Sequence, residues 1–150
     1  IEIIKANNTS EYKTIETLAN VIFHERMTPA FKETMFLLSE TVQAIQQQTE
    51  TEKYNYYLLN YTAQTVGYLG LQEKENTLDI SKIYLLSSYR GLAIGKTALK
   101  FVDAVASIKS FEIIELIVNR KIIDLQKSIK KWIPHSEIIG QHYPHGHGEK

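Results

Sequence analysis

Cysteine is absent from this chain of 150 residues, and neither sign of charge is in excess. Without cysteine no disulfide can form, which is compatible with a reducing cytoplasm. Lys plus Arg and Asp plus Glu each number 17, so no net field attracts nucleic acid or an anionic membrane surface. No apolar run reaches the length that spans a bilayer, and no hydrophobic secretory segment opens the sequence. We therefore expect a cytoplasmic protein that binds neither membranes nor nucleic acid.

Internal repeats, low-complexity linkers and breaks in composition are also missing. A chain of 150 residues is long enough for one substantial hydrophobic core. Its hydrophobic fraction of 43% and charged fraction of 23% are ordinary for a globular domain. We expect a single domain over residues 1–150.

A glycine-containing turn near residues 87–95 is the most informative segment, because the hydrophobic period changes across it. The run over residues 78–86 alternates as a strand does. One face of this strand is expected to carry Leu78, Ile80, Tyr84 and Leu86. After the turn, apolar residues recur at helical spacing at Ile94, Ala98, Phe101, Val102 and Val105. A strand that turns directly into a helix aims the unpaired first-turn N–H groups at the turn, which favours an anion such as a pyrophosphate.

Two known motifs compete for this turn. The string Gly91-Leu92-Ala93-Ile94-Gly95-Lys96-Thr97 ends in Gly-Lys-Thr, as a nucleotide-binding P-loop does. It has three residues between the glycines where the P-loop needs four, and the missing residue removes part of the N–H cradle. A P-loop phosphotransferase is therefore a disfavoured alternative.

The string Arg90-Gly91-Leu92-Ala93-Ile94-Gly95 resembles the pyrophosphate-binding arm of the GNAT superfamily of N-acetyltransferases, Arg/Gln-x-x-Gly-x-Gly/Ala. The length, the arginine, the Tyr-Arg-Gly lead-in and the last glycine match. Ala93 stands where the family usually has its first motif glycine. Because a methyl group at a close backbone approach crowds the ligand, we expect binding to be weakened there.

The predicted elements extend this resemblance along the chain. Strands are expected over residues 1–5, 54–61, 65–72, 78–86, 111–118 and 136–140. The first helix follows the polar turn at residues 7–10 and has an apolar stripe made of Tyr12, Ile15, Leu18, Ala19, Ile22 and Phe23. Further helices are expected over residues 30–38, after a cap at Ser39, after the glycine turn, and over residues 122–132. In the helix after Ser39, Val42 and Ile45 are expected to face inward and residues 46–48 outward.

The order of these elements is that of the GNAT acyl-CoA N-acyltransferase fold. The resemblance implies an α/β (α+β) domain with a mixed central sheet flanked by helices. Three phrases, Ser81-Lys82-Ile83-Tyr84, Tyr89-Arg90-Gly91 and Leu116-Ile117-Val118-Asn119, are similar to a bacterial group of small acetyltransferases within the superfamily. In that group the strand before the motif splays from the next one, and the pantetheine of acetyl-CoA lies in the gap.

The resemblance thus implies acetyl-CoA as cosubstrate and assigns its binding residues. The backbone of Ile83, Tyr84 and Leu85 would bind the pantetheine and the acetyl carbonyl. The pyrophosphate would be bound by Arg90, Gly91, Leu92, Ala93, Ile94, Gly95 and Lys96, with a charge-assisted contact from the lysine.

The catalytic residues are the part where the chain departs from the family. Counted from Val118, the usual asparagine and the usual tyrosine of the last helix fall on Ile122 and Ile129, and isoleucine cannot donate a proton. Two other candidates are Glu25, near the end of the first helix, and Tyr143, after the closing strand. Glu25 would take a proton from an amine through water, and a solvated helix end is the alternative for it. We interpret His142, His145 and His147 as surface residues, because nothing rigid in that glycine-rich segment sets metal-ligand geometry.

These observations predict an N-acetyltransferase that moves the acetyl group of acetyl-CoA to a primary amine by direct attack. The acceptor would belong to a small molecule, a polyamine or a peptide, which suits the acidic balance of residues 1–52. A homodimer is compatible with the sequence. The alternative is a catalytically impaired domain that binds or senses acetyl-CoA, because Ala93, Ile122 and Ile129 stand where functional residues are expected.

Overall fold

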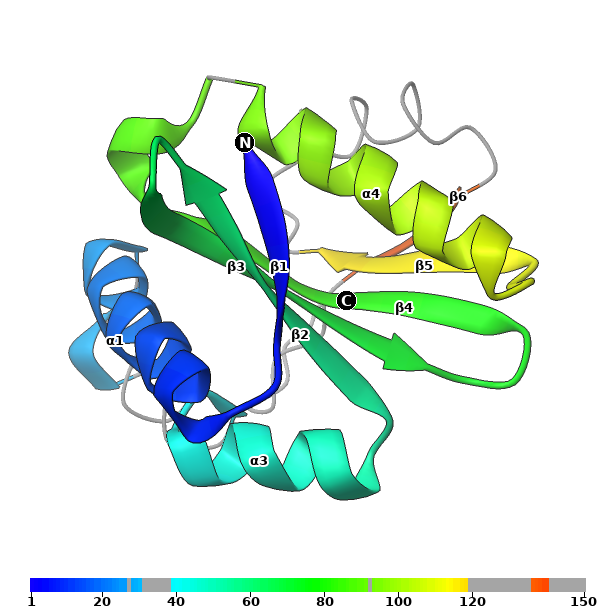
Figure 1. Ribbon diagram of the computed structural model, residues 1–150, viewed down its shortest axis with the longest axis horizontal. Helices are drawn as coiled ribbons and strands as arrows, with labels where there is room; N and C mark the ends of the chain where they lie inside the picture. The colour runs from blue at the N-terminus through cyan, green and yellow to red at the C-terminus, as the bar shows by residue number, and fades with distance from the viewer. Residues whose placement is uncertain (27, 31–38, 92, 119–135, 141–150) are drawn as a thin grey trace.

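The computed structural model describes residues 1–26, 28–30, 39–91, 93–118 and 136–140. Within this part of the chain, six strands form one sheet in the order β1-β2-β3-β4-β5-β6 (Figure 1). The strands are β1 (Glu2–Ala6), β2 (Tyr54–Tyr61), β3 (Gln64–Glu73), β4 (Thr77–Leu85), β5 (Ile113–Val118) and β6 (Ser136–Gly140). β1 to β4 are antiparallel neighbours, whereas β4, β5 and β6 pair in parallel. The predicted mixed sheet is confirmed.

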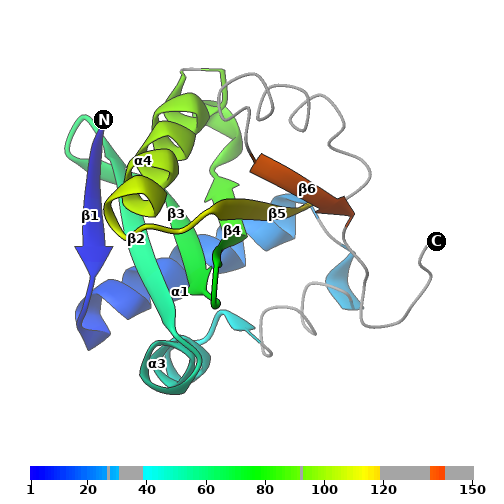
Figure 2. The same ribbon diagram turned by 90° about the vertical axis from the view of Figure 1, so that its right-hand side faces the viewer.

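Helices cover both faces of this sheet (Figures 1 and 2). α1 (Thr9–Arg26) and α3 (Val42–Thr51) pack on one face, in a buried cluster with aromatic side chains of β2 and β3. α4 (Ile94–Ile108) packs on the other face, against aliphatic side chains of β3, β4 and β5. None of the helices within the described ranges is both long and apolar enough to cross a membrane.

The start of α1 is fixed by a reciprocal cap. The N–H of Glu11 donates to Oδ1 of Asn8 at 2.9 Å, and the N–H of Asn7 donates to Oε1 of Glu11 at 2.8 Å. These bonds satisfy N–H groups that a helix start leaves unpaired. The predicted apolar stripe is confirmed, since none of its members is more than 9% exposed: Tyr12, Ile15, Leu18, Ala19, Ile22 and Phe23.

The start of α3 differs from the prediction by two residues. Thr41, and not Ser39, is the cap, because its hydroxyl accepts from the N–H of Ala44 at 3.2 Å. Gln48 is also buried, although we expected it to face outward. Its side-chain amide donates to the carbonyl of Ser39 at 3.1 Å and accepts from the hydroxyl of Tyr56 at 2.5 Å. Paired in this way, a glutamine can lie in the core.

The faces of β4 also differ from the prediction. Ser81 is an extra residue opposite β3, so that β4 is bulged at this point. Ile80 before the bulge lies in the core beneath α4, and so do Ile83 and Leu85 after it. Tyr84 lies instead in the core beside α1. We expected Ile80 and Tyr84 on one face, but an inserted residue moves every following side chain to the opposite face.

A two-residue turn joins β2 to β3, and both of its residues are left-handed. Tyr61 pairs with Gln64, which leaves Thr62 at φ 49° and Ala63 at φ 64°. This is the geometry of a type I′ turn, in which Asn-Gly is preferred. A β-branched threonine and an alanine are strained there.

We therefore expect the double substitution Thr62→Asn, Ala63→Gly to raise the free energy of unfolding by about 1–2 kcal/mol. Urea denaturation followed by circular dichroism measures it. Asn76→Gly is the matched control, because Asn76 lies in the β3–β4 turn without a positive φ and glycine there only adds unfolded-state entropy. Equal effects of the two changes would contradict the strain argument.

Candidate functional site

β4 and β5 diverge at the bulge. They pair in parallel from Thr77 opposite Ile113 to Ile80 opposite Leu116, whereas β4 stays paired with β3 as far as Leu85. In the described part of the chain, residues 81–85 therefore have no strand partner on the β5 side. Extended backbone with an unpaired edge can bind an extended ligand as an added strand.

The predicted thioester-binding residues lie on the part of β4 that has left β5. Ile83, Tyr84 and Leu85 are the last three residues of β4. Opposite them lies Gly67 of β3, where a Cβ atom would stand only 2.3 Å from the carbonyl oxygen of Tyr84. Gly67 therefore permits the close approach of β3 to this edge. We missed it from the sequence, although a glycine inside a strand commonly marks such an approach.

The segment after β4 leads directly into α4, as predicted (Figure 1). A short 3-10 helix, η1 (Ser87–Tyr89), is followed by Arg90 as its C-cap and by Gly91 at φ 82°. α4 then begins at Ile94. The end of β4, η1, the turn at Arg90 and Gly91, and the start of α4 therefore follow one another along the chain, with Leu92 outside the described residues.

The first turn of α4 has the features of an anion site. Ala93 is the N-cap, and its side chain has no atom that can accept a hydrogen bond. The first N–H groups of the helix therefore find no acceptor on their cap residue. A Cβ atom at Gly95 would meet nothing within 4 Å, and Lys96 is exposed. There is thus open space beside the helix start and a cation near it.

Ala93 itself has a left-handed backbone, at φ 61°. This conformation costs a residue with a Cβ atom about 1–2 kcal/mol, whereas glycine adopts it readily. The position where the sequence departs from the family's glycine is therefore one where glycine would be less strained.

Glu25 lies beside the end of β4. This exposed residue is in the last turn of α1, and its Oε1 accepts a hydrogen bond of 2.5 Å from the hydroxyl of Ser87, the first residue of η1. Two residues earlier in α1, the ring of the buried Phe23 meets that of Tyr84 edge-on with centroids 5.4 Å apart. The structure thus brings Glu25 to the same end of the sheet as the predicted cofactor residues, while its role stays a prediction.

Some predicted site residues lie outside the described part of the chain. They are Leu92, Ile122, Ile129, His142, Tyr143, His145 and His147. Most of the helix expected over residues 30–38 and the last helix lie outside it as well. Their assignments stay predictions.

Asp79 is a buried charge at the paired end of β4 that sequence reasoning missed. It is 1% exposed and pairs in register with Glu115 of β5. Its Oδ2 lies 3.4 Å from Nζ of Lys74, and its Oδ1 has no hydrogen-bond partner among the described residues. Burial raises the pKa of the Asp79 carboxyl above its ordinary value, and the ammonium of Lys74 opposes this rise.

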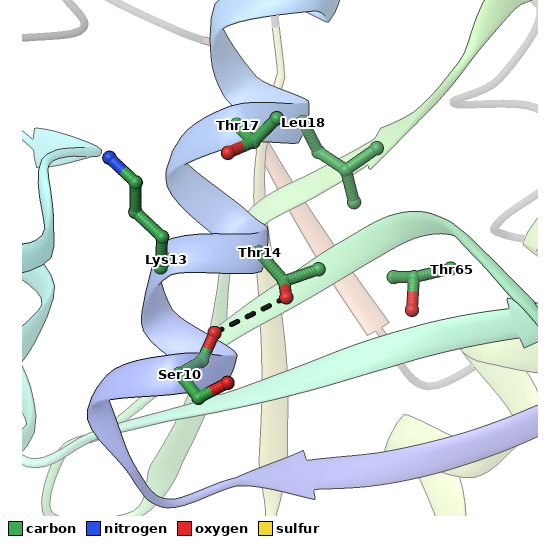
Figure 3. A pocket seen from close by; sticks show the side chains of 6 residues that line it. All are labelled: Ser10, Lys13, Thr14, Thr17, Leu18 and Thr65. Atoms are coloured by element: carbon green, nitrogen blue, oxygen red, sulfur yellow. Dashed lines mark hydrogen bonds between the residues drawn. The ribbon is translucent and has the colours of Figure 1, made fainter.

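A shallow groove lies between α1 and β3 (Figure 3). Its volume is about 470 Å³, and it is lined by Ser10, Lys13, Thr14, Thr17, Leu18 and Thr65. Figure 3 shows the side chain of Lys13 pointing away from Thr65. The ammonium of Lys13 lies 2.5 Å from Oε1 of Glu16, whose pKa this contact lowers. The groove therefore offers hydroxyl groups without a converging charge and is a weaker candidate than the end of β4.

Comparisons with known proteins agree with this geometry. A sequence model described as Acetyltransferase (GNAT) family matches residues 19–125. Among solved structures, PaiA N-acetyltransferase from Thermoplasma acidophilum in complex with coenzyme A has a TM-score of 0.70 at 15% identity, with 87% of this chain and 89% of that chain covered. A GNAT-family acetyltransferase from Staphylococcus aureus Mu50 has a TM-score of 0.62 at 21% identity, with 87% and 81% covered.

A third similar structure is the ribosomal-protein-alanine N-acetyltransferase from Brucella melitensis biovar Abortus 2308. Its TM-score is 0.63 at 12% identity, with 87% of this chain and 90% of that chain covered. The comparison with curated protein sequences gave no match. At these identities the solved structures establish the fold, and the predicted mixed sheet flanked by helices is the one they share.

The raised pKa of Asp79 has a consequence for stability. A carboxyl with a higher pKa in the folded state binds its proton preferentially there, so its contribution is present at low pH and is lost as pH rises through the folded pKa. At pH 7 the buried carboxylate is therefore unfavourable. We expect Asp79→Asn to raise Tm at pH 7 by about 2–4 °C, or roughly 1 kcal/mol.

Thermal denaturation of both proteins between pH 4 and pH 8 measures this difference, which should shrink as the pH falls. Glu75→Gln, an exposed carboxylate in the same β3–β4 turn as Lys74, is the control and should leave Tm unchanged. A lower Tm of Asp79→Asn at pH 7 would mean that the ion pair with Lys74 outweighs the cost of burial.

Proposed function

Because the chain belongs to the GNAT acetyltransferase family, we propose that it transfers the acetyl group of acetyl-CoA to a primary amine. One observation carries this proposal: the end of β4 that has left β5 leads through one turn to the start of α4, where the cap residue makes no side-chain hydrogen bond. An extended arm that ends in a pyrophosphate matches both parts at once, because the edge offers backbone groups and the helix start offers N–H groups. The coenzyme A held by the Thermoplasma protein of similar fold supports it.

In this proposal the pantetheine lies along Ile83, Tyr84 and Leu85 and hydrogen-bonds to their backbone. The pyrophosphate lies against the N–H groups that follow Ala93, and Arg90 and Lys96 neutralise part of its charge. Gly91 and Gly95 leave room for it, because a Cβ at either position would have no atom of another described residue within 4 Å, chain neighbours aside.

The reaction needs positioning more than covalent chemistry. The amine nitrogen attacks the thioester carbonyl carbon, the new N–C bond forms, the C–S bond breaks, and coenzyme A leaves as a thiolate that takes up a proton. The proton of the attacking amine passes through water to Glu25, whose carboxylate lies at the end of β4. By its position in the sequence, Tyr143 is the candidate that protonates the thiolate.

The acceptor class remains part of the proposal: a small molecule, a polyamine or a peptide with a primary amine. Glu25 favours a cationic acceptor because its carboxylate is exposed at this end of the sheet. A catalytically impaired acetyl-CoA-binding domain is the second candidate, because the sequence has Ile122 and Ile129 where the family usually has an asparagine and a tyrosine.

Cofactor binding is tested first, by isothermal titration calorimetry with acetyl-CoA and with ATP. We expect micromolar binding of acetyl-CoA and none of ATP. Ala93→Gly should tighten acetyl-CoA binding several-fold, because it removes a methyl group that crowds the ligand. Gly95→Ala is the matched variant, since its Cβ meets no atom of the described residues within 4 Å but intrudes on the ligand. It should weaken binding without lowering Tm, because alanine loses less conformational entropy on folding than glycine does. Binding of ATP in place of acetyl-CoA would overturn the assignment in favour of a P-loop.

Catalysis is tested with a panel of amines by following release of free thiol. We expect Glu25→Gln to lower kcat by about 100-fold and to leave KM for acetyl-CoA unchanged. Glutamine keeps an acceptor for the hydroxyl of Ser87, so the variant removes the charge alone. Glu50→Gln, an exposed residue of α3, is the control.

Unchanged turnover in Glu25→Gln would identify Glu25 as a solvated helix end. Binding of acetyl-CoA by the natural chain without thiol release from any amine would favour the impaired binding domain.

A further inference from the structure

Lys82 is a buried lysine next to the proposed acetyl-CoA site, and the proposed mechanism does not use it. Only 8% of it is exposed. Its ammonium donates to the carbonyl of Ser39 at 2.9 Å, to Oε1 of Gln48 at 3.2 Å and to the hydroxyl of Tyr56, and it lies 3.5 Å from Oε2 of Glu40. One side chain of β4 thus joins α3, β2 and the turn before α3.

The partners of Lys82 are themselves buried and bonded. Glu40 is 1% exposed, and its Oε2 accepts from the hydroxyl of Tyr68 at 3.1 Å. Burial lowers the pKa of Lys82, and the carboxylate of Glu40 opposes this decrease. Every polar group around the ammonium presents an oxygen to it, so the cluster is built for a charged lysine.

Gly70 of β3 provides the space for this lysine. It pairs with Lys82 across the strands, and a Cβ atom at Gly70 would stand 3.2 Å from Cβ of Lys82 and 3.2 Å from Cε2 of Tyr56. The ammonium lies 5.0 Å from the ring centroid of Tyr56 and 5.5 Å from that of Tyr54. The missing side chain at Gly70 thus lets the lysine stem and an aromatic ring lie over the strand.

The position of Lys82 in β4 places its buried hydrogen-bond cluster at the bulge, next to the proposed acetyl-CoA site. Lys82 follows the bulged residue Ser81 and precedes Ile83. The hydroxyl of Ser81 is itself hydrogen-bonded to that of Tyr54 at 2.7 Å. Hydrogen bonds from β2 and α3 therefore fix both residues at the bulge. This is the point along β4 at which its pairing with β5 ends. A strand paired along one edge can slip by one residue, which would exchange the faces of Ile83 and Tyr84.

We propose that Lys82 is a positioning residue that holds the bulged end of β4 in the register that the pantetheine arm requires. The inference rests on the proposed function. A purely structural role is the alternative, because a buried ion pair can often be replaced by apolar residues without loss of the fold. The positioning role and the structural role predict different binding results. Only the positioning role predicts that a change at Lys82 weakens binding of the pantetheine arm and not binding of the phosphate end.

The test compares two ligands on four variants. Acetyl-CoA spans β4 and the turn, whereas adenosine 3′,5′-bisphosphate lacks the pantetheine arm and reaches the turn alone. The variants are Lys82→Met, the charge-neutral double variant Lys82→Met with Glu40→Gln, Tyr54→Phe at the bulge, and Lys109→Met. Lys109 is the control because its ion pair with Glu73, at 2.6 Å, is on the surface. Calorimetry gives Kd for each ligand, and thermal denaturation gives Tm.

We expect Lys82→Met to raise Kd for acetyl-CoA about tenfold, or roughly 1.4 kcal/mol, and to leave Kd for the bisphosphate within about twofold. The quantity compared is the ratio of Kd for acetyl-CoA to Kd for the bisphosphate. Tyr54→Phe should raise this ratio by a smaller factor than Lys82→Met does, and Lys109→Met should leave it unchanged. If Lys82→Met does not fold, the double variant and Tyr54→Phe decide the question by the same ratio.

An unchanged Kd for acetyl-CoA in a folded variant would overturn the positioning role and leave the proposed function intact. Equal weakening of both ligands would also overturn it, in favour of a structural role. If the natural chain binds no acetyl-CoA, the proposed function fails, and the positioning role fails with it.

Discussion

The rest of the site depends on one constraint in the sheet: β4 must stay paired with β3 while its other edge leaves β5. Unpaired backbone groups at a sheet edge are unfavourable unless water or a ligand bonds them. The divergence begins at the bulge of Ser81, and Gly67 lets β3 approach the carbonyl of Tyr84 closely enough to keep that side paired. β4 then continues through the turn into α4, so the strand edge that has left β5 and the first N–H groups of a helix follow one another along the chain.

Different interactions hold this edge on the two faces of the sheet: apolar packing on one face, and hydrogen bonds with a buried ion pair on the other. Beneath α4 the core is mainly aliphatic, with the ring of Tyr57 packed on that of Phe101, and apolar side chains of β4 pack into it. On the face of α1 and α3 it holds large aromatic rings and a charged pair, Lys82 with Glu40, whose oxygen partners have fixed directions. Packing tolerates many arrangements of similar volume, whereas hydrogen bonds to a buried charge tolerate few. The directional face is the one that contacts the bulge.

Much of the fold could be predicted from the sequence, because its signals are local. The stripe of α1, the start of α4 and the six strands follow from hydrophobic period and turn residues. What could not be predicted depends on partners distant in the sequence. Gln48 is buried because Tyr56 and Ser39 meet its amide, and Tyr84 changes face because β3 opposes β4 with one residue fewer. At the site, the motif led to the predictions for Ile83 to Leu85 and for the helix start, and the structure has Glu25 at the same end of the sheet, hydrogen-bonded to Ser87. The roles of these residues stay predictions, and Tyr143 lies outside the described residues.

β4 and β5 diverge at the point where two kinds of chain connection meet: the hairpins that join β2, β3 and β4, and the long crossover through α4 that joins β4 to β5. β2, β3 and β4 are joined by tight hairpins, so their contacts close short loops. β4 reaches β5 only after the whole of α4, and such a crossover closes later and more slowly. The gap therefore lies on the boundary between a locally assembled meander and a part of the sheet that depends on long-range closure. A molecule bound along it would join the two, and would slow the opening of the sheet as well as serve as a reactant.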